Sequence, residues 1–427
     1  MKINSATTPA LSVFLLIYTL GSFVNFFITP NPYAALHSGK VALDSLVHSA
    51  NFVIQKNIIT IFCIFLAYIY TSRKKIVISL LPVLFIFFST LSGFVSGVIF
   101  NRPMTYLYDG IVFLMVAAIA KNDIAHFFSN ENLQKIFTSA LFIFALSVIL
   151  ALLRPNIWGY LPFQFSRESR GEVTLAAMTG ALIITPCLIF SMNKISFLNR
   201  ILLFIPILII VASTATRSVL VSTMIPLILF SMFRLNSGRR IFYVILIILL
   251  LFIIYTFIGD IFILEKSNST VLEATLTGRA DLWSYYWFKF IKAPFLGHGS
   301  FLLERALNYT GEAFSEIGLL KTAAENGIFA AALQLFAVLF ACVSAVRSLR
   351  NKYSSSIELF TSLLVLAITP NFILQDHSRI LNSTDFIYWY SVFFHIYLFI
   401  SISRFSKLSR TDKFRHKHDQ YLFGRLV

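Results

Sequence analysis

The sequence predicts an all-α polytopic membrane protein with about 12 transmembrane helices and a large helical loop between helices 9 and 10. Of its 427 residues, 57% are hydrophobic and only 13% are charged, and Phe alone occupies 46 positions. Apolar runs of about 18 to 25 residues, the length that crosses a bilayer as a helix, recur along nearly the whole chain. Such a chain has the bilayer as its solvent.

The apolar runs divide the chain into spans and connections. We expect spans at residues 10–29, 54–72, 76–100, 105–120, 136–153, 173–192, 196–213, 216–233, 241–259, 327–346, 355–373 and 385–403. The first run is too long for the apolar region of a signal peptide, so we expect it to be retained as a helix. The predicted organisation is helices 1–9 in 1–259, the large loop 260–326, helices 10–12 in 327–403, and a basic tail 404–427.

The net charge of +16 predicts the orientation of the chain in the membrane. Lys and Arg gather in alternate short connections and in the tail, where Arg404, Lys407 and Arg410 follow the last apolar run directly. Basic connections stay on the cytoplasmic side, so we expect both termini to be cytoplasmic and the loop 260–326 to lie outside. This distribution indicates membrane lipids, and no nucleic acid, as the partner of the positive charge.

The large loop contains an expected amphipathic helix from Thr277 to Lys292. Large apolar residues interleave there with charged ones, and Trp283 and Trp287 stand four residues apart. Such a helix suits the membrane interface, and the two indole rings would share one face at the depth of the headgroups.

Two arginines are candidate anion ligands on the outer side. Arg217 follows Thr214 and Thr216 at the start of a span, where it either anchors the helix end or binds an anion with help from the helix dipole. Arg279 follows Thr277 and Gly278 at the start of the loop helix, where it either pairs with Asp281 or a lipid phosphate, or joins Arg217 in binding a diphosphate. Two guanidinium groups can stabilise a diphosphate as it leaves.

Several outer residues could accept a proton, although each could equally be a solvated surface group. These candidates are His298, Glu312, Glu316, Glu325, Asp376 and His377. His395 lies within a span among aromatic residues, where a hydrogen-bonded packing role is expected. The spacing of His, Cys and Asp predicts no metal site, and no Gly-rich nucleotide loop is present.

Three segments together resemble the O-antigen ligase/polymerase superfamily of polytopic bacterial glycosyltransferases. They are TATRS at a span start, LTGRADLWSYYWFKFIKAPFLGHGS in the large loop, and EIGLLKTAAENGIFAAALQLF at the following span. The resemblance covers residues 205–345. It implies a metal-independent, cofactor-free inverting transfer on the periplasmic face of the inner membrane, with a sugar chain on undecaprenyl diphosphate as donor and a sugar hydroxyl as acceptor.

The resemblance also implies roles for individual residues. Arg217 and Arg279 match the diphosphate-binding arginines of the superfamily. A His commonly stands eleven residues before the Gly of Ala-Glu-x-Gly, but here that position is Glu316. Glu316 can replace the His as the base, or His298 or His377 can supply the base from a neighbouring position.

Two functions follow from this resemblance, and a third follows from the helix count and the basic residues. The leading prediction is a polymerase that joins lipid-linked repeat units of O-antigen, for which a chain-length regulator is a candidate partner. The alternative is the ligase that transfers the finished polysaccharide to the lipid A core, which the missing His disfavours. A transporter of lipid-linked sugars is the third, disfavoured because the spans contain few central charges and the chain shows no internal repeat.

Overall fold

The structure is a computed structural model, in which the described residues are 80–99, 105–124, 217–234, 279–299, 318–351, 354, 356–374 and 385–401. These residues are almost entirely helical, and none of them forms a strand. The all-α class is therefore confirmed for this part of the chain. The count of about 12 spans stays a prediction, because six of the predicted spans lie outside the described residues.

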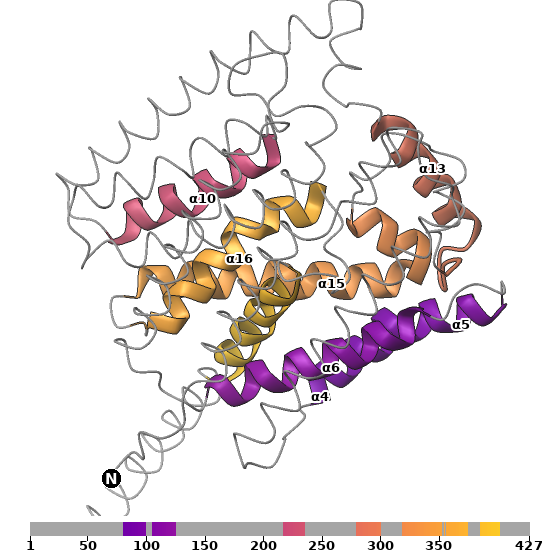
Figure 1. The fold of residues 1–427 in the computed structure, drawn as a ribbon. Coiled ribbons are helices and arrows are strands. Elements are labelled where there is room, and N and C mark those ends of the chain that lie inside the picture. The colour runs from indigo at the N-terminus through magenta and orange to yellow at the C-terminus, as the bar shows by residue number, and fades with distance from the viewer. Residues whose placement is uncertain are drawn as a thin grey trace, which may run out of the picture.

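The other six predicted spans coincide with described helices (Figure 1). The first consists of three consecutive pieces, α4 (Leu80–Ile86), the π-helix η1 (Phe87–Leu91) and α5 (Ser92–Ile99). The remaining helices are α6 (Thr105–Ile124), α10 (Arg217–Arg234), α15 (Gly318–Arg350), α16 (Ser356–Leu374) and a helix over residues 385–401. Among the described helices, α15 is the one long and apolar enough to cross a membrane by length and composition.

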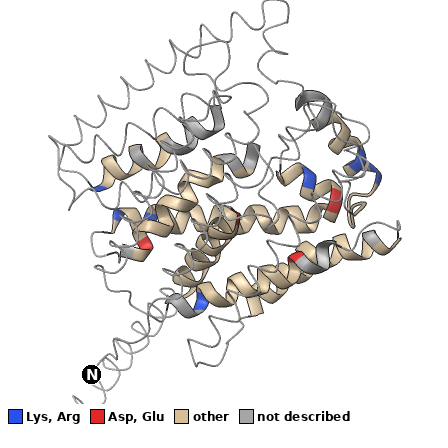
Figure 2. Cartoon of the chain, in the orientation of Figure 1, with Lys and Arg blue, Asp and Glu red and all other residues tan. Residues whose placement is uncertain are grey.

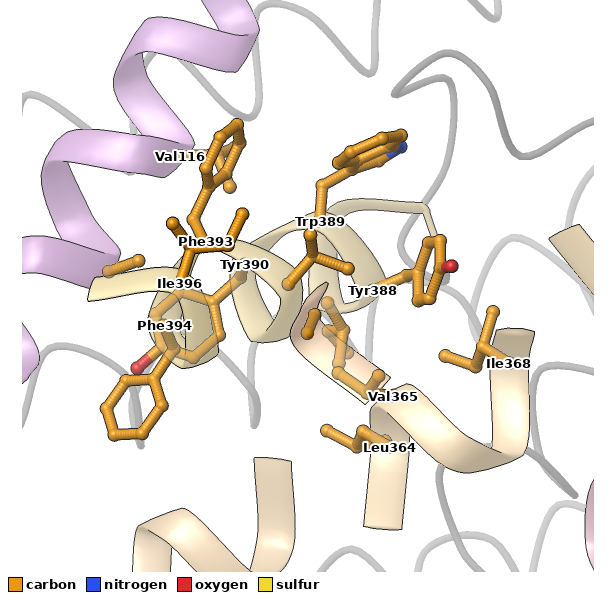
Figure 3. Close-up of a cluster of buried hydrophobic side chains, with 14 of the residues drawn as sticks. Val116, Leu364, Val365, Ile368, Tyr388, Trp389, Tyr390, Phe393, Phe394 and Ile396 are labelled. Atoms are coloured by element: carbon orange, nitrogen blue, oxygen red, sulfur yellow. The ribbon is translucent and has the colours of Figure 1, made fainter. Parts of the chain in front are cut away.

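Trp389 belongs to a cluster of buried side chains that come from helices far apart in the sequence (Figure 3). Trp389 is fully buried, and its ring centroid lies 5.4 Å from Phe85 of α4, 5.0 Å from Phe113 of α6 and 5.9 Å from Phe372 of α16. Edge-to-face and tilted contacts of this kind add to the energy of burial. Trp389 therefore holds the helix over residues 385–401 at the centre of the described helices.

Small and polar residues bring α15, α16 and the helix over residues 385–401 together. Ala341, Ser344 and Ala345 are buried on α15, and small residues let helix backbones approach closely in membranes. His395 is also fully buried, and its ring nitrogens lie 3.3 Å from Ser344 Oγ and 3.2 Å from Thr361 Oγ1. These hydrogen bonds agree with the packing role expected for His395.

The last turns of three helices place basic residues at one end of this helix group (Figure 2). These residues are Lys121 on α6, Arg234 on α10, and Arg347 and Arg350 on α15. Arg234 Nη2 donates hydrogen bonds to Ser348 O at 3.2 Å and to Asn351 O at 2.6 Å. The end of α10 is thus tied to the end of α15. That this basic end lies on the cytoplasmic side stays a prediction.

The predicted loop helix is present as α13 (Arg279–Lys292). It packs against the first part of α15, where fully buried Tyr286 contacts the cluster that contains Ala324 and Leu320. Since the end of α15 lies at the basic end, α13 lies toward the opposite end of the helix group (Figure 1).

Candidate functional site

The site is built around a break in α15 at Gly327. This glycine has φ 85° and ψ 173°, a conformation essentially confined to glycine, within an otherwise helical run. The break comes at the Ala-Glu-Asn-Gly sequence and coincides with the predicted start of the span at residue 327. The nine residues before it form a separate helical segment on the side of α13.

The break frees backbone groups of α15, and the turn after α13 satisfies them. His298 N donates to Ala324 O at 3.0 Å, Gly299 N donates to Glu325 O at 2.9 Å, and Ile328 N donates to Pro294 O at 2.8 Å. Buried backbone groups need such partners, and the turn supplies them to the break.

The turn itself depends on two glycines. Gly297 and Gly299 have φ 69° and 76°, which the Gly-His-Gly sequence allows at both positions.

His298 has a defined orientation in this turn. Its Nε2 lies 3.0 Å from Lys289 O, in the last turn of α13. A carbonyl oxygen only accepts hydrogen bonds, so Nε2 carries the proton, and in the neutral ring the lone pair is on Nδ1. The side chain is partly exposed. His298 is therefore held in the tautomer in which Nδ1 can accept a proton.

The helix of residues 80–99 supports the break from its other side. Ser92 Oγ donates to Asn326 O at 2.5 Å, and Ser96 Oγ donates to Leu296 O at 2.7 Å. Asn326 Nδ2 in turn donates to Ser89 O at 2.8 Å, a carbonyl within the π-helix η1. π-Helical turns often occur at functional sites because they disturb the regular hydrogen bonding of a helix.

Two charged residues are buried just before the break. Lys321 is 2% exposed and Glu325 is 1% exposed. They are four residues apart, so they share one face of α15, and both have interaction partners. Buried charges are costly unless they are compensated, which makes this face a polar part of the site.

The structure places the predicted site residues as follows. His298 lies at the break, Arg217 is the first residue of α10, and Arg279 is the first residue of α13. The side chains of both arginines, and the residues Glu316 and His377, lie outside what the structure describes. Because α10 ends beside the end of α15, Arg217 starts its helix at the end of the group away from the basic residues, as α13 does.

Sequence reasoning missed Lys321, Asn326, Ser92 and Ser96. The spacing of Ser92 and Ser96, four residues apart in an apolar run, is a signal for one polar face of a helix. Lys321 carried a signal as well, because a charge beside the predicted start of a span needs a partner. For Asn326 the sequence offered no signal beyond its place in the Ala-Glu-Asn-Gly sequence.

A family model described as O-Antigen ligase matches residues 202–335. This match supports the resemblance of residues 202–335 to the O-antigen ligase/polymerase superfamily. The match includes α10, α13 and the break in α15, so every described part of the candidate site except the helix of residues 80–99 lies within it. Superfamily members are membrane proteins of polysaccharide biosynthesis. Comparison with curated proteins and with solved structures found no match.

Among the residues that the structure describes, no group of three or more His, Cys, Asp or Glu side chains could hold a metal ion. The polar groups of the site are instead amide, hydroxyl, imidazole and backbone groups together with Lys321 and Glu325. Of these groups, the imidazole of His298 is partly exposed and is of the type that can accept a proton from a sugar hydroxyl.

Proposed function

We propose that the protein is a polymerase that joins oligosaccharide repeat units, carried on undecaprenyl diphosphate, into an O-antigen or related surface polysaccharide. The reaction would take place on the periplasmic face of the bacterial inner membrane. The observation that carries the proposal is the superfamily match over residues 202–335, which contains the two arginines and the helix break.

The donor in this reaction is a lipid diphosphate. Arg217 and Arg279 are each the first residue of a helix, where the helix dipole favours an anion. A guanidinium group at each position can bind the diphosphate oxygens and stabilise the charge that develops as undecaprenyl diphosphate leaves. Such a leaving group requires no metal ion.

The acceptor in this reaction is a sugar hydroxyl on the next repeat unit. Its oxygen would form a bond to the anomeric carbon as the bond from that carbon to the diphosphate breaks, with inversion of configuration. The hydroxyl proton passes to a base, for which Glu316, His298 and His377 are the candidates. Of these, His298 has the support of its oriented ring, with Nε2 bonded to Lys289 O.

Replacement of the two arginines tests the proposed donor site. Arg217→Ala and Arg279→Ala should each abolish the ladder of long polysaccharide chains on a gel while the protein remains in the membrane. Arg234→Ala is a matched control, because Arg234 lies at the other end of α10 and bonds to backbone carbonyls of α15. Unchanged ladders in both arginine variants would refute the proposed donor site.

The ligase is the second candidate, because the matching family model is described as O-Antigen ligase. A deletion strain separates the two functions. Core lipopolysaccharide carrying one repeat unit would indicate a polymerase. Core alone, with polymer accumulating on the undecaprenyl carrier, would indicate a ligase and refute the polymerase.

A further inference from the structure

Helix α13 has two apolar faces, and only one of them packs against the described protein. Tyr286 and Phe290 face α15. On the other side, Trp287, Phe288 and Ile291 are exposed, and the turn that follows exposes Phe295 and Leu296. These five residues, here called the aromatic face, are between 49% and 64% exposed. A contiguous apolar surface of this kind marks a contact with a partner or a membrane.

The aromatic face continues into the exposed surface of α15 beyond the break. Phe295 stacks on Phe329, with ring centroids 6.2 Å apart and an interplanar angle of 28°. Phe329 begins an exposed stripe that continues along α15 through Phe336, Phe340 and Val343. This spacing of seven, four and three residues keeps the stripe on one side of the helix. Because α15 is long and apolar enough to cross a membrane, we expect this stripe to face lipid.

Lys292 borders the aromatic face, and Lys289 lies beside Tyr285 on the same helix. Lys292 Nζ lies 4.2 Å from the ring centroid of Phe288, and Lys289 Nζ lies 5.5 Å from that of Tyr285. Amino groups beside aromatic rings suit the membrane interface, where the rings reach the acyl chains and the cations meet phosphate groups.

We infer that α13 and the turn after it lie in the outer leaflet of the membrane, with the aromatic face among phospholipid acyl chains and Lys289 and Lys292 at the phosphate groups. Continuity with the lipid-facing stripe of α15 selects lipid over a protein partner. The Gly-His-Gly turn directly follows Leu296 and is bonded to the break. The membrane thereby holds His298 at headgroup depth, where, given the proposed function, the donor diphosphate would also lie.

Spin labelling of the full chain in phospholipid nanodiscs tests this placement. Cys63, Cys187 and Cys342 are first replaced by Ala, and single cysteines at Phe288, Ile291 and Phe295 are then labelled with a nitroxide. Phe336→Cys on the exposed stripe is the lipid reference, and Asn351→Cys beyond the basic end of α15 is the water reference. Collisions of each label with oxygen and with a water-soluble nickel chelate are measured.

The expected result is high oxygen accessibility with loss of nickel accessibility at all three positions, as at Phe336. Nickel accessibility like that at Asn351 would show a water-facing helix and overturn the inference. Protection from both reagents would show that protein covers the face, and would overturn it as well. The readout does not involve sugar transfer, so it is independent of whether the proposed function is correct.

A second measurement keeps the native cysteines. Tryptophan fluorescence is recorded in nanodiscs of brominated phospholipids, which quench indoles that contact lipid. Trp287→Phe should remove more of the quenchable signal than Trp283→Phe does, because Trp283 is less exposed on the same helix. Equal losses in the two variants would contradict the placement of the aromatic face in lipid.

Discussion

At the scale of single residues, glycines allow the two segments of the site to meet. A β-carbon on Gly327 would lie 1.9 Å from Phe295 O, and one on Gly297 would lie 2.4 Å from Glu325 O. Both glycines also have positive φ. Neither position has room for a side chain, so the contact between the turn and the break depends on these two residues.

Gly327→Ala should therefore destabilise the protein. The backbone strain alone costs on the order of 1–3 kcal/mol, and the turn must also move away from the break. A lower melting temperature in detergent and a weaker polysaccharide ladder are expected. Gly110→Ala is the control, since the nearest atom there is the Thr90 hydroxyl oxygen rather than a backbone carbonyl. Equal stability of the two variants would show that the break tolerates a side chain.

The base is also a question at the residue scale. His298→Ala, Glu316→Gln and His377→Ala should be compared for chain-length ladders and for protein in the membrane. Loss of the ladder at normal protein levels is expected for the variant that removes the base. Since the Nε2 bond to Lys289 O leaves the lone pair on Nδ1, we expect His298→Ala to weaken the ladder. A normal ladder in that variant would exclude His298.

At the scale of elements, the break in α15 receives support from two sides. The turn after α13 binds its freed backbone groups, while Ser92 and Ser96 of α5 donate to carbonyls on each of the two joined segments. Hydrogen bonds between helices are worth about 0.6 kcal/mol on average in a membrane protein, with a maximum of about 1.7. Together they make α5, the turn and the break one unit.

Removal of these hydroxyl groups should loosen that unit. Ser92→Ala combined with Ser96→Ala should lower the free energy of unfolding by about 1–3 kcal/mol, since two bonds between elements are lost. Ser391→Ala is the matched control, because that buried hydroxyl donates to Ile387 O within its own helix. Thermal unfolding in detergent measures the difference, and a double variant no less stable than the control would argue against this coupling.

At the scale of the whole molecule, the basic last turns of three helices and the candidate site lie toward opposite ends of the described helices. Lys121, Arg234, Arg347 and Arg350 lie at one end, whereas α13 and the break in α15 lie toward the other (Figure 2). By the positive-inside rule, we expect the basic end to lie on the cytoplasmic side. The candidate site would then face the periplasm, where lipid-linked sugars would be joined.

This orientation predicts different labelling of cysteines on the two sides. In a chain without native cysteines, Ser267→Cys in the predicted outer loop should react with a membrane-impermeant thiol reagent in cells with a permeabilised outer membrane. Asn351→Cys at the basic end should react only after the inner membrane is broken. The reverse pattern would invert the predicted topology.

The sequence by itself determined where the described helices lie, because apolar runs, amphipathic spacing and basic connections are local properties of the chain. Helix α10 starts at Arg217 and helix α13 starts at Arg279, and α15 breaks at Gly327. These boundaries agree with the ones predicted from the sequence. Glu316 and His377 lie outside the described residues, so their roles stay predictions.

Only the tertiary structure decided how the site is assembled. It showed that a turn about thirty residues upstream fills the break, and that Ser92 supports it from 234 residues away in the sequence. The physical reason is that a freed backbone carbonyl accepts any donor brought near it. The identity of that donor depends on how the helices pack, and no local pattern of residues encodes it.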